Sequence, residues 1–305
     1  MARYLIARVI GLVFVVIAVS MITFFLTRAV PGDPFAAGER ELPPATVAAR
    51  NAKYGFDKPL IVQYFNYMKG AVRGDFGVPF QSPSRTVTEL IADTWPVTLK
   101  IGALTILLAY PLGLLLGTIA ATHRNGPLDY TVTFAATLGL VLPNFVVSTW
   151  LILIFAVRLD WLPSGGWGKP QHFVLPVIAY ALGPMALVAR YTRTCLVDTL
   201  NADYVRTARA KGLTDRRVLT WHVARNALIP FVTVMLPAIP DILTGSIFIE
   251  QMFRIPGLGK FFVSSTFARD YPMILALVLL VAVVWGFTYL LTDVLYTWLD
   301  PRIRL

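Results

Sequence analysis

The sequence predicts an all-α polytopic membrane protein with six transmembrane helices and a small external domain between the first two. Of the 305 residues, 56% are apolar and 14% are charged, whereas soluble domains have about 45–50% and about 25%. The apolar excess is gathered in runs close to the roughly 17–25 residues that a bilayer-crossing helix needs. Because lipid offers backbone groups no hydrogen-bond partners, we interpret each run as a helix.

The six predicted spans are Val9–Leu26, Ile101–Ala121, Val132–Val157, Phe173–Ala189, Ile229–Ile249 and Met273–Leu291. The first is longer than the apolar core of a cleaved signal peptide, about 7–15 residues, so we expect it to be retained. The fourth is short and contains Pro176 and Pro184. Gly113 and Gly117 in the second span form a pair of small residues that allows close helix packing, although a subunit interface remains open.

Basic residues are distributed unequally between the short loops, which sets the predicted orientation. They gather before the first span, between the second and third, between the fourth and fifth, and after the sixth. The positive-inside rule therefore places both termini and the loop 190–228 in the cytoplasm, and it accounts for the net charge of +10. The signs of a nucleic-acid-binding domain are missing from the sequence, so we expect no nucleic acid partner.

The stretch from Thr27 to Lys100 is too polar to lie in the membrane. It contains three candidate short helices, Ala45–Tyr54, Ile61–Arg73 and Val87–Asp93, and a candidate turn at Gly74–Gly77. About 70 residues bury little core alone, so we expect this region to pack against the spans. The predicted organisation is 1–28 as tip and first helix, 29–95 as external domain, and 96–305 as a five-helix core.

The residues needed for catalysis are not arranged as a site. Pro256–Lys260 superficially resembles a phosphate-binding loop, but Phe253 replaces the first glycine and Phe261 the magnesium-binding Ser or Thr. The three histidines are far apart, and the single cysteine, Cys195, excludes an internal disulfide. We therefore expect neither an enzyme nor a metal or cofactor site in this chain.

Asp241 is the only carboxylate inside a predicted span. Such a group is costly in lipid and usually faces a cavity or a partner. It follows Pro237 and Pro240, which interrupt helical hydrogen bonding. Two interpretations remain open: a pore-lining acid that contacts the substrate, or a structural group hydrogen-bonded to a neighbouring helix.

The segment Tyr204–Pro230 is basic and lies between two predicted spans. Asn201 can cap a helix that Gly212 ends, and Thr214 or Asp215 can cap a second helix. Its positive charge alone could enforce topology or bind anionic lipid. Two short helices at a fixed angle, however, form a rigid knob that suits docking to a protein better.

The chain resembles the permease subunit of bacterial ATP-binding-cassette importers of the dipeptide/oligopeptide type. The resemblance covers almost the whole chain and is carried in order by Pro31–Pro34, Tyr54–Leu60, Gly74–Gly77, Tyr204–Gly212, Arg225–Pro230, Gly245–Gly259 and Arg269–Pro272. The loop of the wider family reads Glu-Ala-Ala-x-x-x-Gly, whereas this chain has Arg206, Thr207 and Ala208 before Gly212. The contact made by the family's glutamate therefore cannot be carried over.

The resemblance implies a heteromeric machine in the bacterial inner membrane. Its other parts would be a second homologous permease, two cytoplasmic ATP-binding subunits that hold ATP and Mg, and an external substrate-binding protein. The implied ATPase contact consists of Tyr204, Arg206, Thr207, Ala208, Arg209, Ala210, Lys211 and Gly212. The external gate or binding-protein contact would involve Glu250, Phe253, Pro256, Gly257 and Gly259, although a structural turn fits these residues equally well.

Several cargoes and one other class of transporter stay open. Relatives of this type also carry nickel, glutathione or sugar oligomers, and nothing in the chain separates these from peptides. A self-sufficient channel or secondary carrier would be expected to show inverted repeats or several membrane acids. Neither feature is evident in the sequence.

Overall fold

The computed structural model describes residues 2–31, 52, 55–214, 217–218 and 235–299, and across these residues the secondary structure is helical throughout. The predicted helix Ala45–Tyr54 and the second helix of the basic loop lie almost entirely outside the described residues. The segment Arg225–Pro230 lies wholly outside them.

Within the described residues, four helices are long and apolar enough to cross a membrane: α1 (Ala2–Ala29), α4 (Val87–Thr122), α7 (Gln171–Leu200) and α14 (Tyr271–Leu299). They contain the first, second, fourth and sixth predicted spans. The longest, α4, has 36 residues and so extends about 54 Å. It begins with a capping box, in which the Thr86 hydroxyl accepts from the backbone N–H of Glu89 and the Glu89 carboxylate accepts from Thr86 N–H.

The third predicted span is strongly bent rather than straight. It comprises α5 (Pro127–Val141), α6 (Asn144–Leu151) and the π-helix η1 (Ile152–Arg158), and it bends by 103° between α5 and α6. Pro143 disfavours helical geometry at the preceding residue, and Leu142 has an extended backbone with φ −71° and ψ 121°. The described part of the chain therefore contains four candidate spans, or five if the bent pair counts as one.

The fifth predicted span is described only from residue 235 onward. There it is divided into η3 (Leu236–Ala238), α11 (Ile239–Leu243) and α12 (Ile247–Met252). Pro237 and Pro240 lie in these short pieces, and Gly245, with φ +93°, separates α11 from α12. A continuous helix over Ile229–Ile249 is therefore wrong for its described part, residues 235–249.

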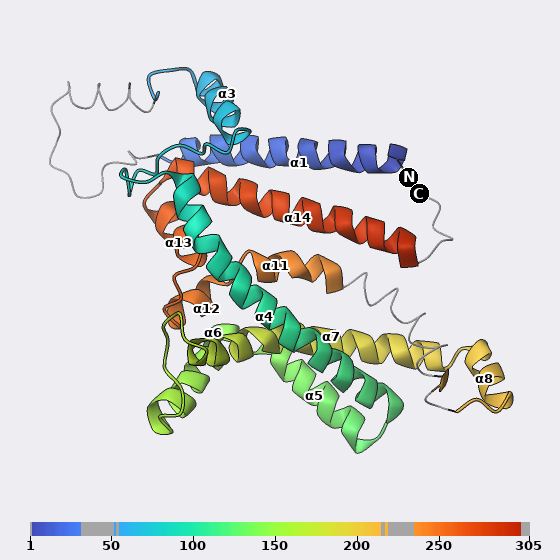
Figure 1. Ribbon diagram of the computed structural model, residues 1–305. Helices are drawn as coiled ribbons and strands as arrows, with labels where there is room; N and C mark the ends of the chain where they lie inside the picture. The colour runs from blue at the N-terminus through green and yellow to red at the C-terminus, as the bar shows by residue number, and fades with distance from the viewer. Residues whose placement is uncertain (1, 32–51, 53–54, 215–216, 219–234, 300–305) are drawn as a thin grey trace.

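The helices α4 and α7 cross in close contact (Figure 1). A Cβ atom on Gly113 would lie 2.6 Å from the Cβ of Val188, and one on Gly117 would lie 2.5 Å from the carbonyl oxygen of Ala189. Only glycine allows the two backbones to approach this closely, so the predicted packing role of Gly113 and Gly117 is confirmed.

A buried ion pair ties α5 to α7. Asp129 is 2% exposed and accepts hydrogen bonds from the Arg193 guanidinium, the Asn125 backbone N–H and the Thr133 hydroxyl. Because α5 belongs to the bent candidate span, Asp129 is a carboxylate inside a candidate span as well, so Asp241 is not the only one. The predicted span Val132–Val157 starts three residues after Asp129 and therefore missed it.

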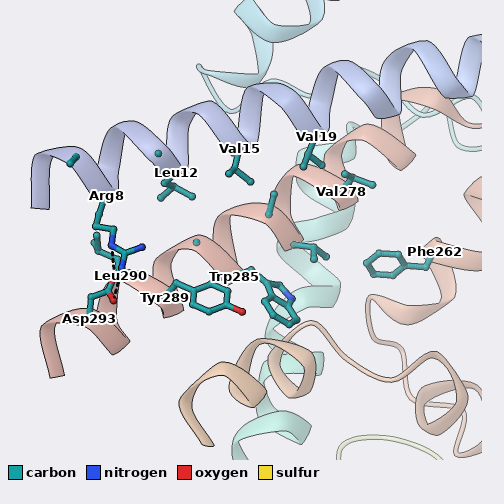
Figure 2. A pocket seen from close by; sticks show the side chains of 15 residues that line it. Arg8, Leu12, Val15, Val19, Phe262, Val278, Trp285, Tyr289, Leu290 and Asp293 are labelled. Atoms are coloured by element: carbon teal, nitrogen blue, oxygen red, sulfur yellow. Dashed lines mark hydrogen bonds and ion pairs between the residues drawn. The ribbon is translucent and has the colours of Figure 1, made fainter. Parts of the chain in front are cut away.

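The helices α1 and α14 run side by side, and the start of α14 also packs on the first turns of α4 (Figure 1). A groove of about 790 Å³ lies along them, lined mainly by apolar side chains such as Leu12, Val15 and Trp285 (Figure 2). At one end the Arg8 guanidinium lies 2.9 Å from the Asp293 carboxylate. This ion pair connects the N-terminal end of α1 to the C-terminal end of α14.

The described part of the region between α1 and α4, residues 55–86, packs on the spans through Tyr64, which is buried with Phe24 of α1 and Leu275 of α14. It contains α3 (Leu60–Ala71), which matches the predicted helix Ile61–Arg73 to within two residues. The predicted helix Val87–Asp93 is not separate, because it forms the first turns of α4. The hydrogen-bonded turn covers residues 72–74 and therefore lies earlier than the predicted turn Gly74–Gly77, although Gly74 and Gly77 both have positive φ, +78° and +81°.

Candidate coupling site

The basic loop contains a short helix, α8 (Asp203–Ala210), which lies beyond the end of α7 (Figure 1). Its two sides differ sharply in burial. Val205 and Ala208 are buried, whereas the side chains of Tyr204, Arg206, Thr207, Arg209 and Lys211 are exposed. The helix therefore rests on the protein through a narrow apolar strip and presents its basic side chains outward.

The end of α8 is a complete glycine cap. Gly212 has φ +80°, its N–H donates to Arg209 O at 2.9 Å, and Leu213 N–H donates to Ala208 O at 3.3 Å. These two bonds define a Schellman motif, and the Leu213 side chain packs on the same apolar cluster as Ala208. The prediction that Gly212 ends this helix is confirmed.

The start of α8 differs from the sequence prediction. The residue at the N-cap position is Ala202, and no side chain caps the helix. Asn201 instead donates from its side-chain amide to Val197 O at 2.9 Å, on the last turn of α7. Asn201 therefore stabilises the end of α7, and Asp203 in the first turn of α8 supplies the charge that suits the helix dipole.

The apolar strip of α8 connects it to two candidate spans. Val205 and Ala208 form one buried cluster with Ala121 near the end of α4 and with Leu196 and Val197 near the end of α7. Val218 completes this cluster from beyond Gly212. These contacts join α8 directly to the adjacent ends of α4 and α7, and packed apolar contacts of this kind transmit strain.

Asp241 lies on α11 with its side chain exposed. The Tyr180 hydroxyl donates to the backbone carbonyl of Asp241 at 3.0 Å, which fixes α11 against α7. Gly102 of α4 packs on Ile242, the residue after Asp241, since a Cβ atom on Gly102 would lie 2.7 Å from Ile242 O. The carboxylate of Asp241 is thus held at a junction of three elements.

A buried hydrogen-bond network holds the segment between α12 and α13 (Gly259–Phe267). Glu250 is 3% exposed; its carboxylate accepts from the Thr98 hydroxyl at 2.7 Å and from Gly259 N–H at 2.5 Å. The Thr98 oxygen in turn accepts from Leu258 N–H at 2.8 Å. The network connects the N-terminal part of α4 with α12 and with the first residue of α13.

Glycines surround the Glu250 carboxylate closely. A Cβ atom on Gly245, Gly257 or Gly259 would lie 2.5–2.7 Å from a carboxylate oxygen of Glu250. Phe253 is fully buried beside this network, whereas Pro256 is exposed. Four of the five predicted gate residues are therefore buried within the segment, and the fifth, Pro256, lies on its surface.

Asp270 is a second buried carboxylate on the same side of the molecule. It accepts from Met273 N–H in the first turn of α14 and from Gln81 N–H at 3.2 Å. Burial raises the pKa of Asp270 above its ordinary value, opposed by these backbone hydrogen bonds. The carboxylate both caps α14 and fixes the region between α3 and α4.

Several residues that hold these sites together could not be identified from sequence patterns. Thr98, Asp129 and Asp270 have partners that are distant along the chain, and their roles emerge only from the fold. Among the described residues, no group of three His, Cys, Asp or Glu side chains could hold a metal ion.

The fold and site define a class of protein: a multi-pass helical membrane subunit with a basic helix mounted on the ends of its spans. Residues 113–305 match the family described as binding-protein-dependent transport system inner membrane component, and residues 1–102 match the N-terminal region described for such membrane components. The chain belongs to this family.

Full-length relatives have closely similar sequences. The chain is 43% identical to the dipeptide transport system permease protein DppB of Bacillus subtilis, covering 100% of this chain and 99% of that protein. It is 40% identical to the oligopeptide transport system permease protein OppB of Salmonella typhimurium, covering 100% of both. A chain from an inward-facing structure of the MetNI methionine ABC transporter has the same fold, with a TM-score of 0.59 and 16% identity over 69% of this chain and 96% of that one.

Proposed function

We propose that this chain is the membrane-spanning subunit of an ATP-driven importer and forms half of the translocation pathway for dipeptides or oligopeptides. The observation that carries the proposal is its 43% identity, over its full length, to a dipeptide permease. Nickel, glutathione and sugar oligomers are alternative cargoes of the same machine, and a self-sufficient channel or carrier is the alternative from another class.

The proposed topology has six spans with both termini and the loop 190–228 in the cytoplasm. Residues 29–95 form the external domain, and residues 96–305 form the permease core. The charge of the short loops supports this orientation. The fifth span, Ile229–Ile249, completes the count of six, and the structure describes it from residue 235 onward.

The proposed partners are a second homologous permease, two cytoplasmic ATP-binding subunits that carry ATP and Mg, and an external binding protein. α8 is the transmission contact, with Arg206, Arg209 and Lys211 facing an acidic surface of the ATPase. Its packing on Ala121, Leu196 and Val197 supports this role. Asp241 is a pathway candidate, and the segment Glu250–Gly259 is the candidate external gate or binding-protein contact, with Pro256 at its surface.

Charge reversal on α8 tests the transmission contact. Arg209→Glu replaces an exposed cation with an anion, so like charges would meet an acidic ATPase surface and weaken association about tenfold or more. Co-purification of the ATPase with the membrane subunits measures the effect. Arg158→Glu, an equal change at the exposed end of η1, is the matched control. Equal ATPase recovery with both variants would contradict the assignment.

A further inference from the structure

A cationic cavity lies where the C-terminal end of α1 meets α3 and the start of α14. Its volume is about 370 Å³, and its lining includes Arg28, Gln63, Asn66 and Tyr67. Volumes of about 300–1,000 Å³ are typical of sites for small ligands. Neither the coupling helix nor the Glu250 network contributes to this cavity.

Aromatic rings hold the Arg28 guanidinium in place. Its central carbon lies 4.3 Å from the ring centroid of Phe24, 5.2 Å from that of Phe56 and 5.3 Å from that of Tyr271. These rings come from α1, from the turn before α3 and from the first residue of α14. Such stacking orients the planar group through its faces and occupies none of its N–H donors.

The charge of Arg28 is not balanced within the described part of the chain. The guanidinium has one hydrogen bond there, from Nη1 to the Gln63 side-chain oxygen, and its Nε is buried without a partner. Gln63 is oriented for this contact because its amide nitrogen donates to Lys58 O at 2.7 Å. The nearby Asp270 carboxylate is directed at backbone N–H groups instead.

Exposed apolar side chains of α3 and of the end of α1 lie beside the cavity. Ile61, Phe65 and Val72 follow one side of α3 and its end, and they are 61%, 66% and 85% exposed. Leu26 and Val30, which flank Arg28, are also exposed. An exposed apolar stripe on a short helix at the end of a span is typical of a helix lying in the membrane interface.

We propose that this cavity binds the phosphate group of a membrane phospholipid, with Arg28 as the ligand and the acyl chains along the apolar surface of α1 and α3. A guanidinium matches the geometry of a phosphate by donating two parallel hydrogen bonds. The candidate span of α1 ends at Ala29, which places Arg28 at the depth of the lipid headgroups. The site is independent of the cargo and of the direction of transport.

Equilibrium binding of labelled dioctanoyl phosphatidylglycerol to the delipidated, detergent-solubilised complex tests the proposal. We expect one saturable site, weakened about tenfold or more by Arg28→Gln and less by Arg28→Lys. Arg8→Gln is the matched control, because it removes the same charge at the other end of α1, where Asp293 balances it. Dioctanoylglycerol, which lacks the phosphate, should bind the wild type and Arg28→Gln equally.

Two results would overturn the proposal. One is equal affinity of phosphatidylglycerol for the wild type, Arg28→Gln and Arg28→Lys. The other is displacement of the lipid by inorganic phosphate at an equal concentration, since this would make the cavity a site for the free ion. Binding of phosphatidylglycerol, dioctanoylglycerol and inorganic phosphate can also be compared on the wild-type complex alone. This comparison stands even if a variant does not fold.

Discussion

Gly212→Val is expected to uncouple ATP hydrolysis from uptake. Gly212 has φ +80°, and a left-handed backbone costs an L-residue about 1–2 kcal/mol, more if it is β-branched. The surroundings offer no compensation and no clash, because a Cβ there has no heavy atom within 4 Å. The strain would therefore break the cap of α8 and loosen Val205 and Ala208 from the ends of α4 and α7.

The measurement is substrate uptake per ATP hydrolysed in reconstituted vesicles. We expect this ratio to fall about tenfold or more in Gly212→Val, with ATPase activity continuing. Gly212→Asn is the matched control, because asparagine tolerates the left-handed region and should retain most of the coupling. Normal coupled uptake in Gly212→Val would show that coupling does not depend on the glycine cap of α8.

Glu250→Ala is expected to cause a large loss of stability. The substitution leaves the Thr98 hydroxyl and the Gly259 N–H without their buried acceptor. Each unsatisfied group costs about 1–3 kcal/mol, so we expect a total of about 2–6 kcal/mol. The unfolding temperature in detergent should fall by about 5–15 °C, and Glu250→Gln, which keeps one acceptor oxygen, should fall less.

A double-mutant cycle with Gly257→Ala separates this network from general damage to the segment. The new methyl group would lie 2.5 Å from the Glu250 carboxylate, so Gly257→Ala should be destabilising in the wild type. With Glu250→Ala already present, the clash is gone and the second substitution should cost much less. Additive losses in the double variant would refute the proposed contact.

The sequence predicted those features that depend on nearby residues. Four spans follow from long apolar runs, and the end of α8 follows from Gly212 because one glycine determines the cap. Asn201 was assigned to the wrong helix because an amide can act as a donor to the turn before it as readily as an acceptor for the turn after it. Pro143 could indicate either a mild kink or a sharp bend, and only packing decides between them.

The contacts that depend on distant residues could not be predicted from one sequence. Thr98 and Glu250 are 152 positions apart, and Asp129 and Arg193 are 64 positions apart. Because the pattern of one segment contains no information on its partner, Glu250 could be read as a surface gate residue as easily as a buried anchor. The fold resolves its burial, whereas gating and binding-protein contact remain predictions.

The most direct test of the account is uptake of a labelled dipeptide or oligopeptide into vesicles that contain this chain with its partner permease, ATPases and binding protein. We predict uptake that requires ATP and the binding protein and is lost in Gly212→Val. Transport of nickel or another solute with ATP would support the assignment as an ATP-driven importer and contradict the peptide substrate. Peptide uptake that continues without ATP would contradict the central claim and identify a channel or secondary carrier.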